Sequence, residues 1–200
     1  MARYTGPAIK QSRREGVALT DKAQKYLDRR PYPPGEHGRG RIRQSEYLLQ
    51  LREKQKTRRF YGVLEKQFRR YYAKASRQPG ITGENLLRML ELRLDNVVYR
   101  LGFAATRRQS RQLVNHGHFR VNGKKVDIPS YQVKADDVIT LKEGSSAEGV
   151  VRAATELVAV VAPWLQADYD ALNGKVLKAP ERSEIDTPVS EQLIVELYSK

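Results

Sequence analysis

Three arginines near the middle of the chain have the spacing and the chemistry of a phosphate-binding group. Arg107, Arg108 and Arg111 fall on one face of a predicted short helix, which begins after Thr106 and is closed by Gly117. The other face of that helix is largely apolar and predicts packing against a core. A guanidinium group offers paired N–H donors to a phosphate, whereas a lysine ammonium is a point charge. The sequence therefore predicts a helix that holds several phosphates at fixed positions.

The residues that follow this helix extend the same candidate surface. Asn122-Gly123 lies between two short runs that read as strands, and this pair is typical of a type I′ hairpin turn. Histidine rings can stack on unpaired bases, while amide and ammonium groups donate hydrogen bonds to bases and phosphates. The two histidines here have no third ligand at metal-site spacing, so we interpret them as RNA contacts. The further candidates are Gln112, His116, His118, Asn122, Lys124 and Lys125.

A second group of cations surrounds the apolar stripes of a predicted helical stretch, residues 44–77. Ten lysines and arginines lie between residues 52 and 77, where Glu53 and Glu65 are the only acids, so pairing within the helix cannot neutralise them. Phosphates would relieve their mutual repulsion. The RNA-binding candidates here are Arg52, Lys54, Lys56, Arg58, Arg59, Arg69 and Arg70. In the segment before this stretch, the candidates are Arg3, Arg13, Arg14, Arg39, Arg41 and Arg43.

The charge of the 200-residue chain is unevenly distributed. Its formal net charge is +14, and segments 1–78, 79–134 and 135–200 carry +14, +6 and −6 respectively. A basic excess of this size predicts a polyanionic partner for the first two segments. The acidic last segment predicts a surface that faces solvent or a basic protein.

Composition excludes several functional classes. The chain has no cysteine, which excludes a disulfide framework, a cysteine zinc site and a thiolate nucleophile. No apolar run approaches the roughly 18 residues of a membrane span, and the N-terminus lacks the apolar segment of a signal peptide. We therefore expect a cytoplasmic protein with no membrane partner. We also expect no catalytic residues, no metal and no cofactor.

The elements that must position these residues predict an α+β fold. We expect a basic arm over 1–43, with a short helix at 20–30 and then an irregular Pro- and Gly-rich run. A helical RNA-binding region is expected at 44–92, with helical periodicity that starts at Thr82 and continues toward Leu101. A helix-turn-helix/β module should follow at 93–157. Residues 158–200 are expected to form two strands around Asn173-Gly174 and a closing helix, packing back on the helical region.

A specific resemblance begins in this module. RLDNVVYRLGF at 93–103 and TRRQSRQLVNHGHFRVNGKKVDIPSYQVKADDVITL at 106–141 resemble the small RNA-binding module named after the fourth protein of the bacterial small ribosomal subunit. The similarity extends along essentially the whole chain and keeps the order of the motifs. They are MARYTGP at 1–7, SRREG at 12–16, PPGEHG at 33–38, LREKQKTRRFYGVLEKQFRRYY at 51–72, TGENLL at 82–87 and LIVELYSK at 193–200. The chain is identified as a member of that ribosomal protein family.

The resemblance implies a structural constituent of the small ribosomal subunit. It implies a primary binder of 16S rRNA, at a multi-helix junction of the 5′ domain, that nucleates assembly of the 30S body. It also implies a contact with the fifth small-subunit protein and, together with the fifth and twelfth proteins, an effect on translational accuracy. The family also lies near mRNA where it enters the subunit.

One departure from the family pattern concerns metal. Many members carry four cysteines in the arm that bind zinc or an iron–sulfur cluster, whereas Ile9 and Ser12 stand where the first pair would be expected. The later pair is missing as well. We therefore expect the arm to be ordered by packing around Tyr26 and Leu27 and by rRNA.

Two other functions remain open on the sequence. Arg93-Leu94-Asp95 resembles the triplet that holds the catalytic Asp of pseudouridine synthases, which predicts an RNA-modifying enzyme. The simpler interpretation is that Asp95 caps a helix or pairs with a nearby arginine, because a three-residue motif is weak. The second is a stand-alone binder of structured RNA or DNA, the DNA-binding form using a helix-turn-helix around 102–106. Such a protein would use one recognition helix in a major groove, whereas these cations spread over arm, helices and hairpin.

Overall fold

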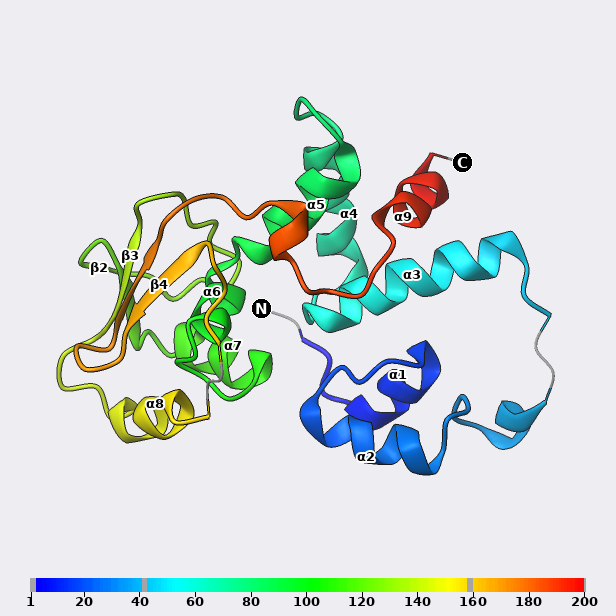
Figure 1. Ribbon diagram of the computed structural model, residues 1–200, viewed down its shortest axis with the longest axis horizontal. Coiled ribbons are helices and arrows are strands. Elements are labelled where there is room, and N and C mark those ends of the chain that lie inside the picture. The colour runs from blue at the N-terminus through cyan, green and yellow to red at the C-terminus, as the bar shows by residue number, and fades with distance from the viewer. Residues whose placement is uncertain (1–2, 41–42, 158–159, 200) are drawn as a thin grey trace. The chain divides into compact units, whose positions relative to one another are not determined.

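The computed structural model describes residues 3–40, 43–157 and 160–199 (Figure 1). The chain divides into two compact units. The first contains the chain up to Gly83 together with the segment that begins at Thr187, and the second is Glu84–Asp186. Each unit carries part of the predicted cationic surface, so we describe them separately.

Helices build the first unit. They are α1 (Ala8–Glu15), α2 (Asp21–Arg29), the 3₁₀ helix η1 (Glu36–Arg39), α3 (Glu46–Phe60), α4 (Glu65–Ala75), the start of α5 (Thr82–Glu91), and α9 (Glu191–Tyr198). The predicted helix at 20–30 is confirmed as α2. In contrast, α1 and η1 lie in stretches for which the sequence indicated no regular structure.

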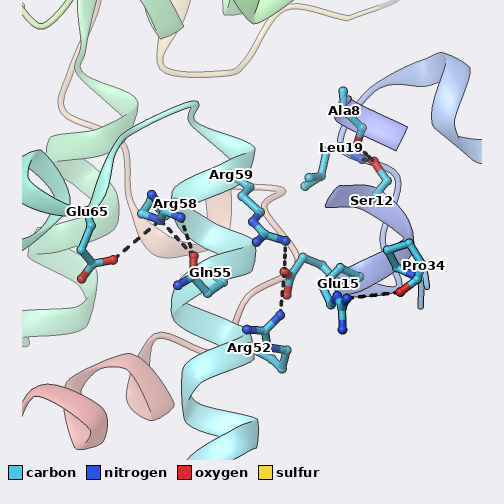
Figure 2. Close-up of polar contacts among 11 residues, drawn as sticks. Ala8, Ser12, Glu15, Leu19, Pro34, Arg52, Gln55, Arg58, Arg59 and Glu65 are labelled. Carbon is cyan, nitrogen blue, oxygen red and sulfur yellow. Dashed lines mark hydrogen bonds and ion pairs between the residues drawn. The ribbon is translucent and has the colours of Figure 1, made fainter. Parts of the chain in front are cut away.

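Small side chains allow the helices of the arm to approach each other. Ser12 of α1 and Ala23 of α2 are fully buried. The Ser12 hydroxyl donates to the Ala8 carbonyl and accepts the N–H of Leu19 (3.3 and 3.2 Å; Figure 2). The expected packing around Tyr26 is wrong, because that side chain is 45% exposed.

The long predicted helical stretch is two helices. Ser45 caps α3, because its hydroxyl oxygen accepts the N–H of Leu48 (3.2 Å). This hydrogen bond satisfies one of the N–H groups that have no partner within the first turn of a helix. The chain then turns at Gly62, whose φ of 65° is left-handed and readily adopted only by glycine. The i+4 stripe that begins at Phe60 is therefore divided between α3 and α4, and Phe68 of α4 becomes fully buried.

Helix α9 returns from the end of the chain to pack on α3. The Gln50 amide donates to Glu196 of α9 (3.1 Å), and the hydroxyls of Tyr61 and Thr187 share a buried hydrogen bond of 2.9 Å. The ring of Tyr198 stacks on that of Tyr72 with centroids 4.4 Å apart. The predicted closing helix is confirmed, and it completes the first unit.

The second unit combines helices with one antiparallel sheet, which confirms the α+β class. Its elements are the rest of α5, α6 (Leu94–Arg100), α7 (Arg107–Asn115), β1 (Phe119–Val121), β2 (Lys124–Lys125), β3 (Val138–Leu141), α8 (Glu148–Thr155), β4 (Leu165–Asp168), β5 (Asn173–Val176) and the 3₁₀ helix η2 (Arg182–Glu184). The five strands follow the order β2-β1-β3-β5-β4. Buried side chains from the helices and sheet, among them Phe119, Ile139, Val151 and Trp164, form one core.

The helical periodicity from Thr82 to Leu101 is interrupted between α5 and α6. Arg93 has an extended backbone and forms an isolated bridge with Gln132. The N–H of Leu94 donates to Tyr131 (2.8 Å), and that of Val133 donates to the Leu92 carbonyl (2.9 Å). Pairing with this later segment thus replaces helical hydrogen bonds at the break.

Two turn predictions had different outcomes. Asn122 and Gly123 have φ of 50° and 75°, both positive as a type I′ turn requires, and they join β1 to β2. Asn173-Gly174, in contrast, lies inside β5, and the turn falls earlier, where Leu172 has φ of 49°. Strands β4 and β5 pair with each other and β5 with β3, so they extend the sheet of the second unit. The closing helix, in contrast, belongs to the first unit.

Candidate nucleic-acid interface

Helix α7 presents the predicted arginine face. Thr106 caps it by accepting the N–H of Gln109 (3.2 Å), and Ser110, Leu113 and Val114 are buried beneath it. Arg108 and Gln112 are exposed, while Arg107 and Arg111 are half-buried. We call Arg107, Arg108 and Arg111 with Gln112 the α7 face.

Neutral groups hold Arg107 in place. Its Nε donates to the Asn96 side-chain oxygen (2.9 Å), and its guanidinium carbon lies 4.4 Å from the centre of the Tyr99 ring. An amide oxygen and an aromatic face orient a guanidinium without cancelling its charge. These two contacts therefore fix the position of the Arg107 guanidinium.

A buried carboxylate holds Arg111. Asp95 receives two hydrogen bonds from Arg93, Nε to Oδ1 at 2.9 Å and Nη2 to Oδ2 at 2.6 Å, and a third from Arg111 Nη1 to Oδ2 at 3.1 Å. Arg93 is only 1% exposed. Two guanidinium groups share one carboxylate, which leaves one net positive charge. The interpretation of Asp95 as a partner of nearby arginines is confirmed.

A second buried acid supports Arg107 through Asn96. Glu91 accepts from Nε and Nη2 of Arg100 (3.1 and 3.0 Å) and from the Asn96 amide (2.7 Å). Asn96 thus bridges the two residues: its amide N–H donates to Glu91, and its side-chain oxygen accepts from Arg107. Sequence reasoning missed Glu91 and Asn96, because only the fold brings α6 against α7 and the side chain of Asn96 between Glu91 and Arg107.

The hairpin adjoins the end of α7. A Cβ on Gly117 would collide with the Cε of Lys125, so this lysine lies directly over the turn that follows the helix. Lys124 and Lys125 are both exposed. Asn122 lies in the turn, and its side-chain amide reaches the start of β3. It donates to Asp137 (2.8 Å) and accepts from the N–H of Val138 (2.9 Å). Its first role is thus to hold the hairpin to the loop before β3.

The two histidines have different surroundings. His116 is exposed, and its ring centre lies 6.1 Å from that of His118. His118 Nδ1 is 2.8 Å from the hydroxyl of Ser145. Loss of hydration lowers the pKa of His118, and the positive charges of His116 and Lys142 lower it further. The lowered pKa favours the neutral form of His118, which offers hydrogen bonds and a ring surface.

Five of the ten cations between residues 52 and 77 have acidic partners. Glu53 pairs with Lys56 (2.6 Å), and Glu65 pairs with Lys54 (3.0 Å) and Arg58 (3.7 Å). Arg52 and Arg59 reach Glu15 of α1 (Figure 2). The expectation of an unneutralised cluster is thus wrong for these five, because one acid can serve two cations and another helix supplies a third acid. The exposed cations that remain are Lys66, Arg69, Arg70, Lys74 and Arg77.

Arginines of the arm gather around Tyr32. The guanidinium carbons of Arg13 and Arg39 each lie 4.9 Å from the centre of its ring. Arg13 Nε donates to the Tyr32 carbonyl (3.1 Å), and Arg14 Nη2 donates to the Pro34 carbonyl (3.2 Å). The α1 arginines thereby hold the Pro-rich loop.

The other candidates of the arm are Arg3, Arg41 and Arg43. Arg3 and Arg43 are exposed, and Arg41 lies outside the described residues.

Within the described ranges, no three His, Cys, Asp or Glu side chains gather where they could hold a metal ion. In the same part of the chain, no helix has the length and apolar character that crossing a membrane requires.

Known proteins resemble the chain along its whole length. A family model described as the ribosomal protein S4/S9 N-terminal domain matches residues 3–91, and one described as the S4 domain matches residues 92–139. Small ribosomal subunit protein uS4 of Nocardioides sp. is 62% identical over 202 residues, and that of Rubrobacter xylanophilus is 56% identical over 200 residues. Both comparisons cover 100% of each chain. The predicted resemblance is confirmed, and the chain belongs to the uS4 family of small ribosomal subunit proteins.

Proposed function

We propose that the chain binds 16S rRNA directly, at a junction of helices in the 5′ domain, and so nucleates assembly of the 30S body. The observation that carries this proposal is the α7 face. Two of its arginines, Arg107 and Arg111, are held by Asn96, Tyr99 and Asp95, so they do not lose much conformational entropy when they bind phosphates. A rigid arrangement of guanidinium groups suits one RNA shape better than a flexible basic tail does.

Family membership sets the broader role. The chain is a structural component of the small ribosomal subunit, it works in the cytoplasm, and it is not an enzyme. The first unit adds the exposed cations of α4 and the arginines around Tyr32 as further phosphate contacts. Phosphate contacts of this kind supply affinity and fix register, while exposed side chains such as Gln112 and His116 are available to bases.

The acidic segment at the end of the chain is better suited to bind proteins than RNA. Carboxylates repel RNA, and the segment 135–200 has a net charge of −6. We assign this part to a contact with the fifth small-subunit protein, and through it and the twelfth protein to translational accuracy. Contact with mRNA where it enters the subunit belongs to the same proposal.

The proposal is tested by replacing both Arg107 and Arg108 with Ala in the full chain. Arg111 stays, because it holds Asp95. Loss of two phosphate contacts should weaken binding to a 5′-domain transcript of 16S rRNA by about tenfold or more, and should lower the salt slope of log K by roughly 1.8. Titrations at several salt concentrations measure both quantities.

The matched control replaces Lys175 and Lys178 with Ala. Both lysines already have acidic partners, Asp136 at 2.8 Å and Glu184 at 2.9 Å, and should contribute little. Equal losses in the two variants would contradict the assignment of the α7 face. Equal affinity of the unaltered chain for duplex DNA would contradict the choice of rRNA.

A further inference from the structure

Glu15 is an acid inside a cationic surface. It is the last residue of α1, and its side chain is 0% exposed. One oxygen, Oε1, accepts from Nη1 of Arg52 at 3.3 Å and also from Nη1 of Arg59 (Figure 2). This carboxylate therefore connects the arm helix to two turns of α3.

Local helix energetics do not account for a glutamate at this place. The C-terminal end of a helix carries partial negative charge, so an acid there is unfavourable by about 0.3–1 kcal/mol. Burial is costly as well: it raises the pKa of Glu15, and the nearby arginines only partly oppose this. The position must therefore be explained by what Glu15 does to Arg52 and Arg59.

The hydrogen bonding of the three side chains is incomplete. Glu15 Oε2, Arg52 Nε and Arg59 Nε are buried and have no hydrogen-bond partner among the described residues. A buried ion cluster selected only for stability would satisfy these atoms, because each unsatisfied one is costly. One carboxylate with two guanidinium groups also leaves one net positive charge.

The geometry keeps both arginines available to a ligand. Arg52 and Arg59 are seven residues apart, which places them on the same side of α3 about two turns apart. Their side chains keep 31% and 19% exposure, whereas Glu15 keeps none. Without Glu15 the two guanidinium groups, with Arg58 on the same helix, would repel one another.

We propose that Glu15 is a positioning residue for RNA binding. It docks α1 on α3 and holds the guanidinium groups of Arg52 and Arg59 together, so that the pair binds one phosphate of the RNA backbone with its net positive charge. This inference rests on the proposed rRNA-binding function and assigns to an acid a role in it. If Glu15 only repelled RNA phosphates, its carboxylate would instead weaken RNA binding.

The test compares Glu15→Gln with Glu36→Gln in the full chain. Both variants remove one negative charge from the arm, but Glu36 is exposed. Glu15→Gln should weaken binding to the 5′-domain transcript by about tenfold and reduce the salt slope by about 0.9, the value for one phosphate. Glu36→Gln should bind as tightly as the unaltered chain or slightly more tightly. Unchanged or tighter binding by Glu15→Gln would overturn the proposal.

A double-mutant cycle covers the case in which Glu15→Gln loosens the arm. Arg52→Gln is measured alone and in the Glu15→Gln background. If Glu15 acts through Arg52, the second substitution costs much less affinity once the first is present. Full additivity would mean that Glu15 only stabilises the fold, and would overturn the proposal. Failure of the unaltered chain to bind the transcript would contradict the proposed function itself, a separate result.

Discussion

Single carboxylates organise the cations of this protein. Asp95 gathers Arg93 and Arg111, and Glu91 gathers Arg100 and, through Asn96, Arg107. Each acid is buried, so its charge is poorly screened by water and acts strongly on its neighbours. Arg107 and Arg111 of the α7 face are thus held in position by buried side chains.

Asp95→Asn should strongly destabilise the second unit. The substitution removes the buried charge that Arg93 and Arg111 share, and breaking a buried ion pair typically costs about 3–5 kcal/mol. Denaturant unfolding followed by circular dichroism measures the loss. Asp136→Asn is the control, because its pair with Lys175 is exposed and such pairs contribute at most about 1 kcal/mol. Equal effects of the two substitutions would refute the structural role of Asp95.

At the residue scale, the sequence predicts which side chains face outward but not what they meet. Helical periodicity correctly separates Arg108 from the buried Leu113. It cannot reveal that Glu15 pairs with Arg52 and Arg59, because that contact spans 37 and 44 residues and depends on how α1 packs. Counting acids within one helix therefore overstated the free positive charge.

At the element scale, sequence signals predict the structure correctly where neighbouring residues alone determine the backbone conformation. Ser45 and Thr106 cap helices, and Asn122-Gly123 makes a hairpin, as their residue types predict. Asn173-Gly174 carries the same turn signal and lies in a strand. The reason is tertiary: Gly174 faces the side chain of Leu101, which leaves no room for a Cβ.

Gly174→Ala should therefore destabilise the second unit. The added methyl would press on Leu101, which is itself fully buried and has little space to move, at a cost of about 1–3 kcal/mol. Thermal unfolding measures the change. Gly149→Ala in α8 meets open space and should instead stabilise by about 0.5–1 kcal/mol. A neutral Gly174→Ala would mean that the close approach to Leu101 is not restrictive.

At the scale of the whole molecule, the number of phosphates contacted determines how binding responds to salt. If rRNA binding uses roughly six to ten phosphates, affinity should fall by about three to five orders of magnitude between 50 and 200 mM salt. Titration of the full chain with the 5′-domain transcript measures this slope. A nearly flat response would contradict an interface built on arginine–phosphate contacts.

The path of the chain also has a consequence in time. The first unit begins at the N-terminus, but its last helix, α9, is made of residues 191–198, so the second unit is inserted within it. During synthesis α3 and α4 are made long before the buried Ile194 and the ring of Tyr198, which cover them in the folded unit. Domains commonly fold as they emerge, N-terminal first. Here helices α3 and α4 keep an uncovered face until α9 has been made, whereas every residue of the second unit precedes α9 in the chain.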